Sequence, residues 1–217
     1  GVGLDTFASS VVGVDASGTA ITPTYTYADS RCSRQVAELR LALDEAAVQQ
    51  RTGARLHTSY LAPRLRWLAQ TEPTTFAAVR SWLSIGEYAY LRLLGTAAAG
   101  TSTAAWTGLL NRFTGDWDDE MLAAACISAA TLSPVHDPDQ ALLPRPGSPA
   151  SGWSTVAKIP WFPPVSDGIA SNLGAGATDA STIVAAAATS GALRVLVHDL
   201  PEQLPAGLWC YRIDRHR

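Results

Sequence analysis

One acidic residue and one polar turn are the groups best suited to handling phosphate. Asp167 is followed by Gly168 in a stretch of small residues, and Thr189-Ser190-Gly191 lies between two apolar runs. A carboxylate can accept the proton of an attacking hydroxyl group. A Thr-Ser-Gly turn presents hydroxyls and backbone N–H groups, and its glycine lets the backbone come close to a ligand. Together these residue types indicate chemistry on a phosphoryl group.

Both features also have a plainer interpretation. Asp-Gly is a common signal for a hairpin turn, and Ser-Gly ends strands in many folds. Neither Asp167 nor the Thr-Ser-Gly turn therefore identifies a catalytic site without its structural context. Asp29 has two roles open to it, because it can bind a ligand or cap the helix that follows it.

The composition argues against two classes of protein. The chain has 217 residues and a formal net charge of −3, which is enough for one large domain or one and a half. Proteins that bind nucleic acid use clustered Lys and Arg, and the basic cluster here is confined to residues 212–217. No run of about 18 apolar residues occurs. The sequence thus predicts neither nucleic-acid binding nor a membrane span.

The three cysteines are far apart and form no C-x-x-C motif. This pattern predicts reduced and mostly buried thiols, as in cytosolic proteins. The start of the sequence lacks the pattern of a signal peptide, so a cytoplasmic location is expected. The four histidines have no paired ligand at the i+3 or i+4 position, which disfavours a zinc site and a metal hydrolase.

Hydrophobic periodicity and turn residues predict a mixed α/β chain. Two hairpins are predicted, one over residues 11–26 around a turn at 15–19, and one over residues 182–197. Apolar residues at helical spacing predict helices over residues 29–50, 57–68, 73–82 and 87–94, and a further helix that starts at 116–120. Residues 134–154 are rich in Pro, Ser and Gly and indicate a surface connection, with a domain boundary at 161–165.

An ordered set of short segments resembles the FGGY family of carbohydrate kinases, most closely its gluconate kinase-like and xylulose kinase-like members. The segments keep the family's order and spacing over nearly the whole chain. They are Thr6-Phe7-Ala8-Ser9-Ser10, Val14-Asp15, Ala28-Asp29-Ser30-Arg31, residues 59–67, Trp106-Thr107-Gly108-Leu109-Leu110, Gly115-Asp116-Trp117, Asp167-Gly168, Asn172-Leu173-Gly174 and Thr189-Ser190-Gly191.

The resemblance implies a fold and a division into domains. The fold is the actin-like, ribonuclease H-like α/β type, in which ATP and the sugar bind in the cleft between two domains. Residues 1–163 would form most of the sugar-binding N-terminal domain without its first strands. Residues 164–217 would begin the nucleotide-binding C-terminal domain.

The resemblance also implies an activity, which is ATP-dependent phosphorylation of a hydroxyl group on a sugar or sugar acid. Asp167 would be the general base, and Mg²⁺ would accompany ATP, although no residue of this chain is assigned to the metal. The implied substrate-binding residues are Ser9, Ser10, Asp29 and Arg31. The implied phosphate-binding residues are Gly168, Thr189, Ser190 and Gly191.

Several positions depart from the family pattern. Ser9 stands where gluconate kinase-like members usually carry His, Ser166 and Ala188 stand where Gly is usual, and Arg64 replaces a usual Lys. Family members also begin with an Asp-x-Gly-Thr hairpin that is not found here, and they continue past Arg217. An internal piece with little or no kinase activity of its own is therefore expected.

A second class of function stays open beside the kinase. The chain can be a non-catalytic sugar-binding or regulatory remnant that keeps the fold after its site has eroded. The sequence does not name the sugar, because specificity depends on a few hydrogen bonds. It also leaves the oligomeric state open, with a homodimer as one option.

Overall fold

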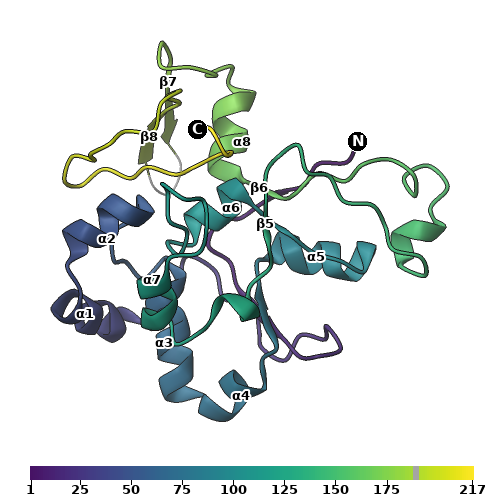
Figure 1. Cartoon of the computed structure of the whole chain (residues 1–217), viewed down its shortest axis with the longest axis horizontal. Coiled ribbons are helices and arrows are strands. Elements are labelled where there is room, and N and C mark those ends of the chain that lie inside the picture. Colours follow the sequence, from purple (N-terminus) through teal and green to yellow (C-terminus); the bar gives the residue numbers. More distant parts are fainter. Residues whose placement is uncertain (188–190) are drawn as a thin grey trace.

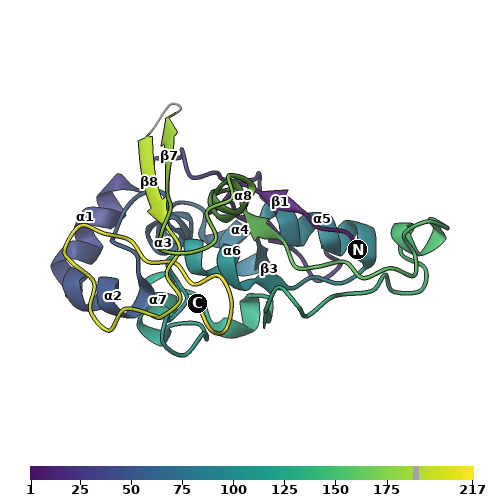
Figure 2. The ribbon, with the colours of Figure 1, turned by 90° about the horizontal axis from the view of Figure 1, so that it is seen from above.

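The computed structural model describes residues 1–187 and 191–217. Helices and short strands are mixed along the chain, and helices α1 to α4 gather with α7 on one side of the molecule (Figure 1). The hairpin of β7 and β8 stands out from the body (Figure 2). Because this hairpin and α8 carry the predicted phosphate-handling residues, their attachment to the body decides the geometry of the site.

Most helices follow local start and stop signals. Ser84 caps α5 (Ile85–Leu94) in a capping box with Glu87, and Gly95 ends this helix in a left-handed conformation. The predictions of a helix over 87–94 and of one after residues 116–120 are confirmed. The other helices are α1 (Ser33–Ala42), α2 (Glu45–Thr52), α3 (Leu61–Thr71), α4 (Pro73–Ala78), α6 (Thr101–Trp106), α7 (Asp119–Ala124) and α8 (Asp167–Gly174), with 3₁₀ turns at Ala129–Thr131 and Pro149–Gly152.

The single helix predicted over residues 29–50 is wrong, since this stretch forms α1 and α2. Asp44 separates them, because its carboxylate accepts hydrogen bonds from the N–H groups of Ala46 and Ala47 and so starts a new helix. Gly53 ends α2 in a left-handed conformation. The sequence interpretation overlooked Asp44 as a cap within an otherwise helical pattern.

The helix predicted over residues 73–82 is also wrong in its second half. It ends at Ala78, and Ser81–Leu83 form strand β3, which pairs antiparallel with β2 (Val12–Val14). Trp82 lies opposite Gly13 in this pair and is buried. The partner strand lies far away in the sequence, so local periodicity does not show it.

The remaining strands also pair in twos within the described residues. The antiparallel hairpin of β7 (Ile183–Ala187) and β8 (Gly191–Val195) confirms the predicted second hairpin, with Ile183 opposite Val195. The parallel pairs are β1 (Asp5–Thr6) with β6 (Val165–Ser166), and β4 (Ala99–Gly100) with β5 (Val135–His136). Parallel pairing of such distant segments gathers the two ends of the predicted site.

The first predicted hairpin is confirmed only in part. Its turn exists, because the N–H of Asp15 donates to the carbonyl of Thr19. The second arm contributes isolated bridges at Ala20 and Tyr25 instead of a strand. The main partner of β2 is β3.

The largest apolar core lies between α1, α2, α3 and α7. It includes Val36, Leu39, Val48, Leu65, Leu68, Leu109 and Met121. A smaller cluster joins Ile169 of α8 to Leu196 and Ile213, with Trp106 packed against it. This second cluster connects the elements around Asp167 to the end of the chain.

The segment after β8 is tied to α2 by side chains that bind its backbone. The amide group of Gln49 donates to the carbonyls of Pro205 and Leu208. The fully buried guanidinium of Arg112 donates to the carbonyls of Gln50, Pro201 and Glu202. Figures 1 and 2 both show this segment passing alongside α2.

Gly53 gives a test of this attachment. An added Cβ would collide with the carbonyl oxygen of Cys210, and the backbone φ of 71° is itself unfavourable for other residues. We expect Gly53→Ala to lower the free energy of unfolding by more than about 2 kcal/mol, measured by urea denaturation. Gly147→Ala is the matched control, because Gly147 has a φ of 83° and open space around it; its cost should be about 1 kcal/mol. Equal costs for the two substitutions would contradict the packing argument.

Candidate functional site

Asp167 occupies the first position of α8, directly after β6. The sequence interpretation offered a hairpin turn as the plain alternative, and the structure shows a helix start instead. One oxygen of the carboxylate, Oδ1, accepts a hydrogen bond from the N–H of Gly168 at 3.0 Å and lies 3.4 Å from the N–H of Ala8. The negative charge thus sits at the positive end of the helix, where it is favoured.

A second carboxylate lies close to Asp167. Burial raises the pKa of Asp5, and the charge of Asp167 raises it further. Asp5 reaches this position because β1 runs parallel to β6, with Asp5 opposite Val165. The strand pairing therefore places two acidic groups at one end of the candidate site.

Gly168 packs tightly against α6. A Cβ at this position would lie 2.8 Å from a ring carbon of Trp106. The same tryptophan ring is stacked on Tyr211, with ring centroids 4.0 Å apart. Gly168 is thus required for the close approach of α8 to Trp106, and its predicted contact with phosphate stays a prediction.

Ser9 is buried and has a positive φ of 57°, which is uncommon for a residue other than glycine. Its hydroxyl donates to the carbonyl of Trp106 at 2.6 Å. The hydroxyl of Ser10 donates to the carbonyl of Phe7 and accepts from the N–H of Ile85. Both hydroxyls therefore brace the loop, and their predicted contacts with a substrate stay predictions.

Asp29 and Arg31 form a bidentate ion pair. The Nε and Nη2 atoms of Arg31 lie 3.0 and 2.6 Å from Oδ1 and Oδ2 of Asp29. The hydrogen bond from Arg31 holds the pKa of Asp29 below its ordinary value. The guanidinium also lies 4.4 Å from the ring centroid of Trp67, which supports a cation–π contact. The alternative in which Asp29 caps α1 is wrong, because Cys32 is the N-cap and provides no side-chain bond.

Arg64 lies between the Ser9 loop and the Asp29–Arg31 pair. Its guanidinium donates to the carbonyl of Ser9 at 2.7 Å, and burial lowers its pKa while the nearby Cys32 and Asp29 groups act in the opposite direction. Contacts therefore run from Asp167 through Ala8 and Ser9 to Arg64. Asp29 lies close enough for its negative charge to favour the charged form of Arg64. This arrangement joins the predicted substrate residues to the predicted base.

Part of the predicted phosphate loop lies outside the described residues, namely Thr189 and Ser190. Gly191 is described and is exposed as the first residue of β8, opposite Ala187. A mainly apolar cavity of about 660 Å³ lies between β8, α8 and the segment that follows β8. Gly191 and Trp106 both line it, so the hairpin and the Trp106 side of the body share one space.

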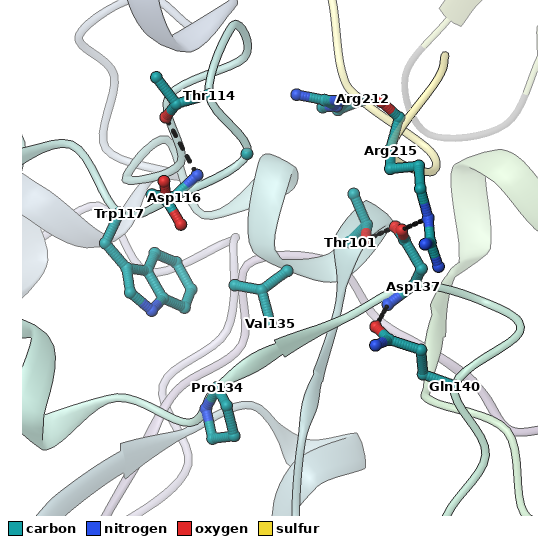
Figure 3. Close-up of a pocket in the computed structure, with 11 residues that line it drawn as sticks. Thr101, Thr114, Asp116, Trp117, Pro134, Val135, Asp137, Gln140, Arg212 and Arg215 are labelled. Carbon is teal, nitrogen blue, oxygen red and sulfur yellow. Dashed lines mark hydrogen bonds and ion pairs between the residues drawn. The ribbon is translucent and has the colours of Figure 1, made fainter.

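A separate pocket of about 370 Å³ lies under the last residues of the chain (Figure 3). Arg215 forms ion pairs there with Asp137 at 2.5 Å and with Asp139 at 2.9 Å, and Asp137 accepts from the hydroxyl of Thr101. None of the predicted site residues that the structure describes lies in its wall. Its opposite charges face each other, so it serves to hold the end of the chain.

Two residues around the site were not assigned to it from the sequence. In the sequence, Arg64 is recognisable only as a departure from the family pattern, and Trp106 only as part of a segment that matches the family. The signal for Arg64 was its charge at a helix position surrounded by apolar residues, because such a cation must find partners when buried. No local signal shows that Trp106 faces Gly168, since the two lie far apart in the sequence.

Some further predictions concern groups away from this site. Cys32 is buried and Cys210 half-buried, but Cys126 is exposed, so the prediction of mostly buried thiols is wrong for one of three. Within residues 1–187 and 191–217, no group of three or more His, Cys, Asp or Glu side chains is arranged to hold a metal ion. No helix in the described part of the chain is long and apolar enough to cross a membrane.

The sequence profile of the FGGY family of carbohydrate kinases, N-terminal domain, matches residues 1–174. The chain belongs to this family. The gluconokinase of Bacillus subtilis (strain 168) is 27% identical over 209 residues, which are 95% of this chain and 40% of that protein. The xylulose kinase of Escherichia coli (strain K12) is 29% identical over 181 residues, or 82% of this chain and 36% of that protein. The chain thus spans about 40% of the length of these FGGY relatives.

Solved structures of FGGY kinases confirm the predicted fold. The xylulose kinase and the gluconate kinase of Lactobacillus acidophilus each superpose with a TM-score of 0.89 at 27% identity, over 98% of this chain and 43% of theirs. The α/β fold is therefore the actin-like, ribonuclease H-like fold of FGGY kinases, and the match covers its first domain. The division at residues 163 and 164 stays a prediction.

The ion pair between Asp29 and Arg31 makes a pH-dependent contribution. Because the folded pKa of Asp29 is lowered, its stabilising effect is present above the unfolded pKa and is lost as the pH falls through the folded value. We expect Arg31→Met to raise the pKa of Asp29 toward its ordinary range, measured by NMR titration of the carboxyl carbon. Arg34→Met removes an exposed pair with Glu38 and should leave Asp29 unchanged. An unaltered pKa in Arg31→Met would show that another group holds it down.

Proposed function

We propose that the protein transfers the γ-phosphoryl group of ATP to a hydroxyl group of a sugar or sugar acid, with Asp167 as the general base. The observation that carries this proposal is the position of Asp167. Asp167 starts α8 and accepts a hydrogen bond from the N–H of Gly168. It also lies next to Ala8, which belongs to the loop that contains the predicted substrate residues Ser9 and Ser10. The similarity to gluconokinase and xylulose kinase suggests a gluconate-like or xylulose-like substrate.

The proposed reaction needs little covalent chemistry from the protein. The Asp167 carboxylate accepts the proton of the sugar hydroxyl as its oxygen attacks the γ-phosphorus in line. The new sugar O–P bond forms while the bond to the leaving oxygen of ADP breaks. Thr189, Ser190 and Gly191 would hold phosphate oxygens through backbone N–H groups and hydroxyls, and Gly168 would let a phosphate oxygen come close to the backbone beside Asp167.

The hydrogen bonds of the site limit how a sugar can bind. Because the Ser9 hydroxyl donates to the carbonyl of Trp106, it retains only acceptor capacity. A sugar hydroxyl would therefore donate to Ser9. The side chain of Arg31 is 57% exposed despite its pairing with Asp29, so it can meet an anionic group such as a carboxylate or a phosphate.

Mg²⁺ with ATP is part of the proposal on the strength of the family alone. Asp5 and Asp167 are neighbouring carboxylates of the kind that Mg²⁺ prefers as ligands. No third acidic, His or Cys side chain of the described residues joins them. No residue is therefore assigned to the metal, and no step of the reaction is assigned to it.

A non-catalytic sugar-binding or regulatory role is the second candidate. One observation favours it: Ser9 and Ser10 are buried and their hydroxyls are bonded within the chain. A protein whose Ser9 and Ser10 hydroxyls bind its own backbone would keep the fold without catalysing phosphoryl transfer. Turnover by the protein decides between the two candidates.

The setting of the protein is also proposed. We place it in the cytoplasm, with a small-molecule partner and neither nucleic acid nor a membrane, and a homodimer is retained as one option. Residues 1–217 alone should show little or no kinase activity, because the reaction needs two domains that close on the ligands.

Asp167→Asn tests the proposed base. In the full-length protein with Mg·ATP and a panel that includes gluconate and xylulose, we expect kcat to fall by about 10²- to 10⁴-fold, since general-base catalysis is lost. The sugar should still raise the melting temperature of the variant.

Asp179→Asn is the control, because Asp179 is a partly exposed carboxylate that accepts hydrogen bonds only from Ser181 among the described residues, and it should retain the parental kcat. Parental turnover in Asp167→Asn would remove Asp167 from the role, and absence of turnover in the parent would favour the remnant.

A further inference from the structure

Arg64 is buried in an unusual way for a charged residue. It is only 1% exposed, and within the described residues it forms no ion pair at hydrogen-bonding distance. Its Nε atom is also buried without a hydrogen-bond partner among them. A charge is costly to bury, so its retention here calls for a function.

The terminal nitrogens of Arg64 hold two separate loops by their backbone carbonyls. Nη1 donates to Ser9 at 2.7 Å, in the loop between β1 and β2. Nη2 donates to Thr58 at 3.0 Å and to Ser59 at 3.2 Å, in the loop before α3. A planar guanidinium with fixed donor directions sets the separation of these loops more tightly than a single ammonium could.

The loop that Arg64 holds is conformationally strained. Ser9 has a φ of 57°, a conformation that persists only where the surroundings impose it. Arg64 binds the Ser9 carbonyl while the carbonyl of Trp106 binds the Ser9 hydroxyl. The residue before it, Ala8, presents its N–H toward Asp167. The position of Ser9 therefore affects both the predicted substrate-binding loop of Ser9 and Ser10 and the orientation of Asp167, the predicted base.

We propose that Arg64 is a positioning residue that keeps the Ser9 loop in the conformation required for sugar binding. This inference rests on the proposed kinase function. It assigns Arg64 no contact with substrate, because the side chain is buried. Loss of Arg64 should weaken sugar binding selectively, since the Ser9 loop moves and the ATP side is untouched.

Arg112 provides a closely matched control. It is equally buried at 1% exposure and also donates to three backbone carbonyls, those of Gln50, Pro201 and Glu202. It holds the segment after β8 to α2 and makes no bond to the Ser9 loop. Comparing the two arginines separates a general loss of stability from an effect on the sugar site.

The experiment compares Arg64→Met, Arg64→Lys and Arg112→Met in the full-length protein, with gluconate and xylulose as the sugars. We expect Arg64→Met to raise KM for the sugar about ten-fold or more, since small misplacements are costly, and to leave KM for ATP within about two-fold of the parent. Arg64→Lys should recover part of the loss. Arg112→Met should lower the melting temperature but keep the parental KM for the sugar. If Arg64→Met does not fold, the KM values of Arg64→Lys decide.

A second measurement makes the inference independent of turnover. Amide hydrogen exchange at Ala8 and Ser9 should accelerate in Arg64→Met and Arg64→Lys and stay parental in Arg112→Met. A parent without turnover on any sugar defeats the proposed kinase function, and exchange then still decides whether Arg64 holds the loop. A parental KM for the sugar in the Arg64 variants, an equal rise in Arg112→Met, or unchanged exchange would overturn the inference.

Discussion

The parallel pairing of β1 with β6 is the contact on which the candidate site depends. It places Thr6 opposite Ser166, so the residues that follow each strand leave the pair at the same edge. Asp167 follows one strand, and the Ala8–Ser9 loop follows the other. No other contact is needed to explain why residues 159 positions apart meet within hydrogen-bonding range.

Two buried arginines are stabilised in the same way, by hydrogen bonds to backbone carbonyls. Arg64 and Arg112 each satisfy their charge mainly with backbone carbonyls instead of carboxylates. Charge-assisted bonds to carbonyls are stronger than neutral ones, and a guanidinium can reach several carbonyls at once. Each arginine thus holds irregular backbone that has no strand or helix to order it. Loops can keep a defined shape in this way without regular secondary structure.

The sequence predicted the features that have local causes. Apolar residues at helical spacing over 87–94 form α5, and two β-prone runs form the β7–β8 hairpin. Trp82 was misassigned because it pairs with Gly13 of a distant strand, and no helix or strand period carries that information. Asp29 was left between two roles because the capping preference ignores the competing guanidinium of Arg31, which lies two residues on.

The same division applies to the site. Residue types and order were enough to indicate a phosphoryl-transfer family, and the match over residues 1–174 confirms that family. The inward turn of the Ser9 and Ser10 hydroxyls was not predictable, because it depends on partners in α6 and at the start of α5. Which carbonyls Arg64 reaches is likewise set by packing between distant segments.

The hairpin of β7 and β8 stands out from the body (Figure 2), and large apolar side chains of both strands are exposed. Leu193 is 77% exposed and Ile183 64% exposed, and each strand pairs only with the other among the described residues. Unpaired strand edges next to apolar side chains act as templates for strands of other molecules. The hairpin therefore offers residues 1–217 one surface for association with other molecules, and added sulfate, which strengthens apolar burial, favours that association.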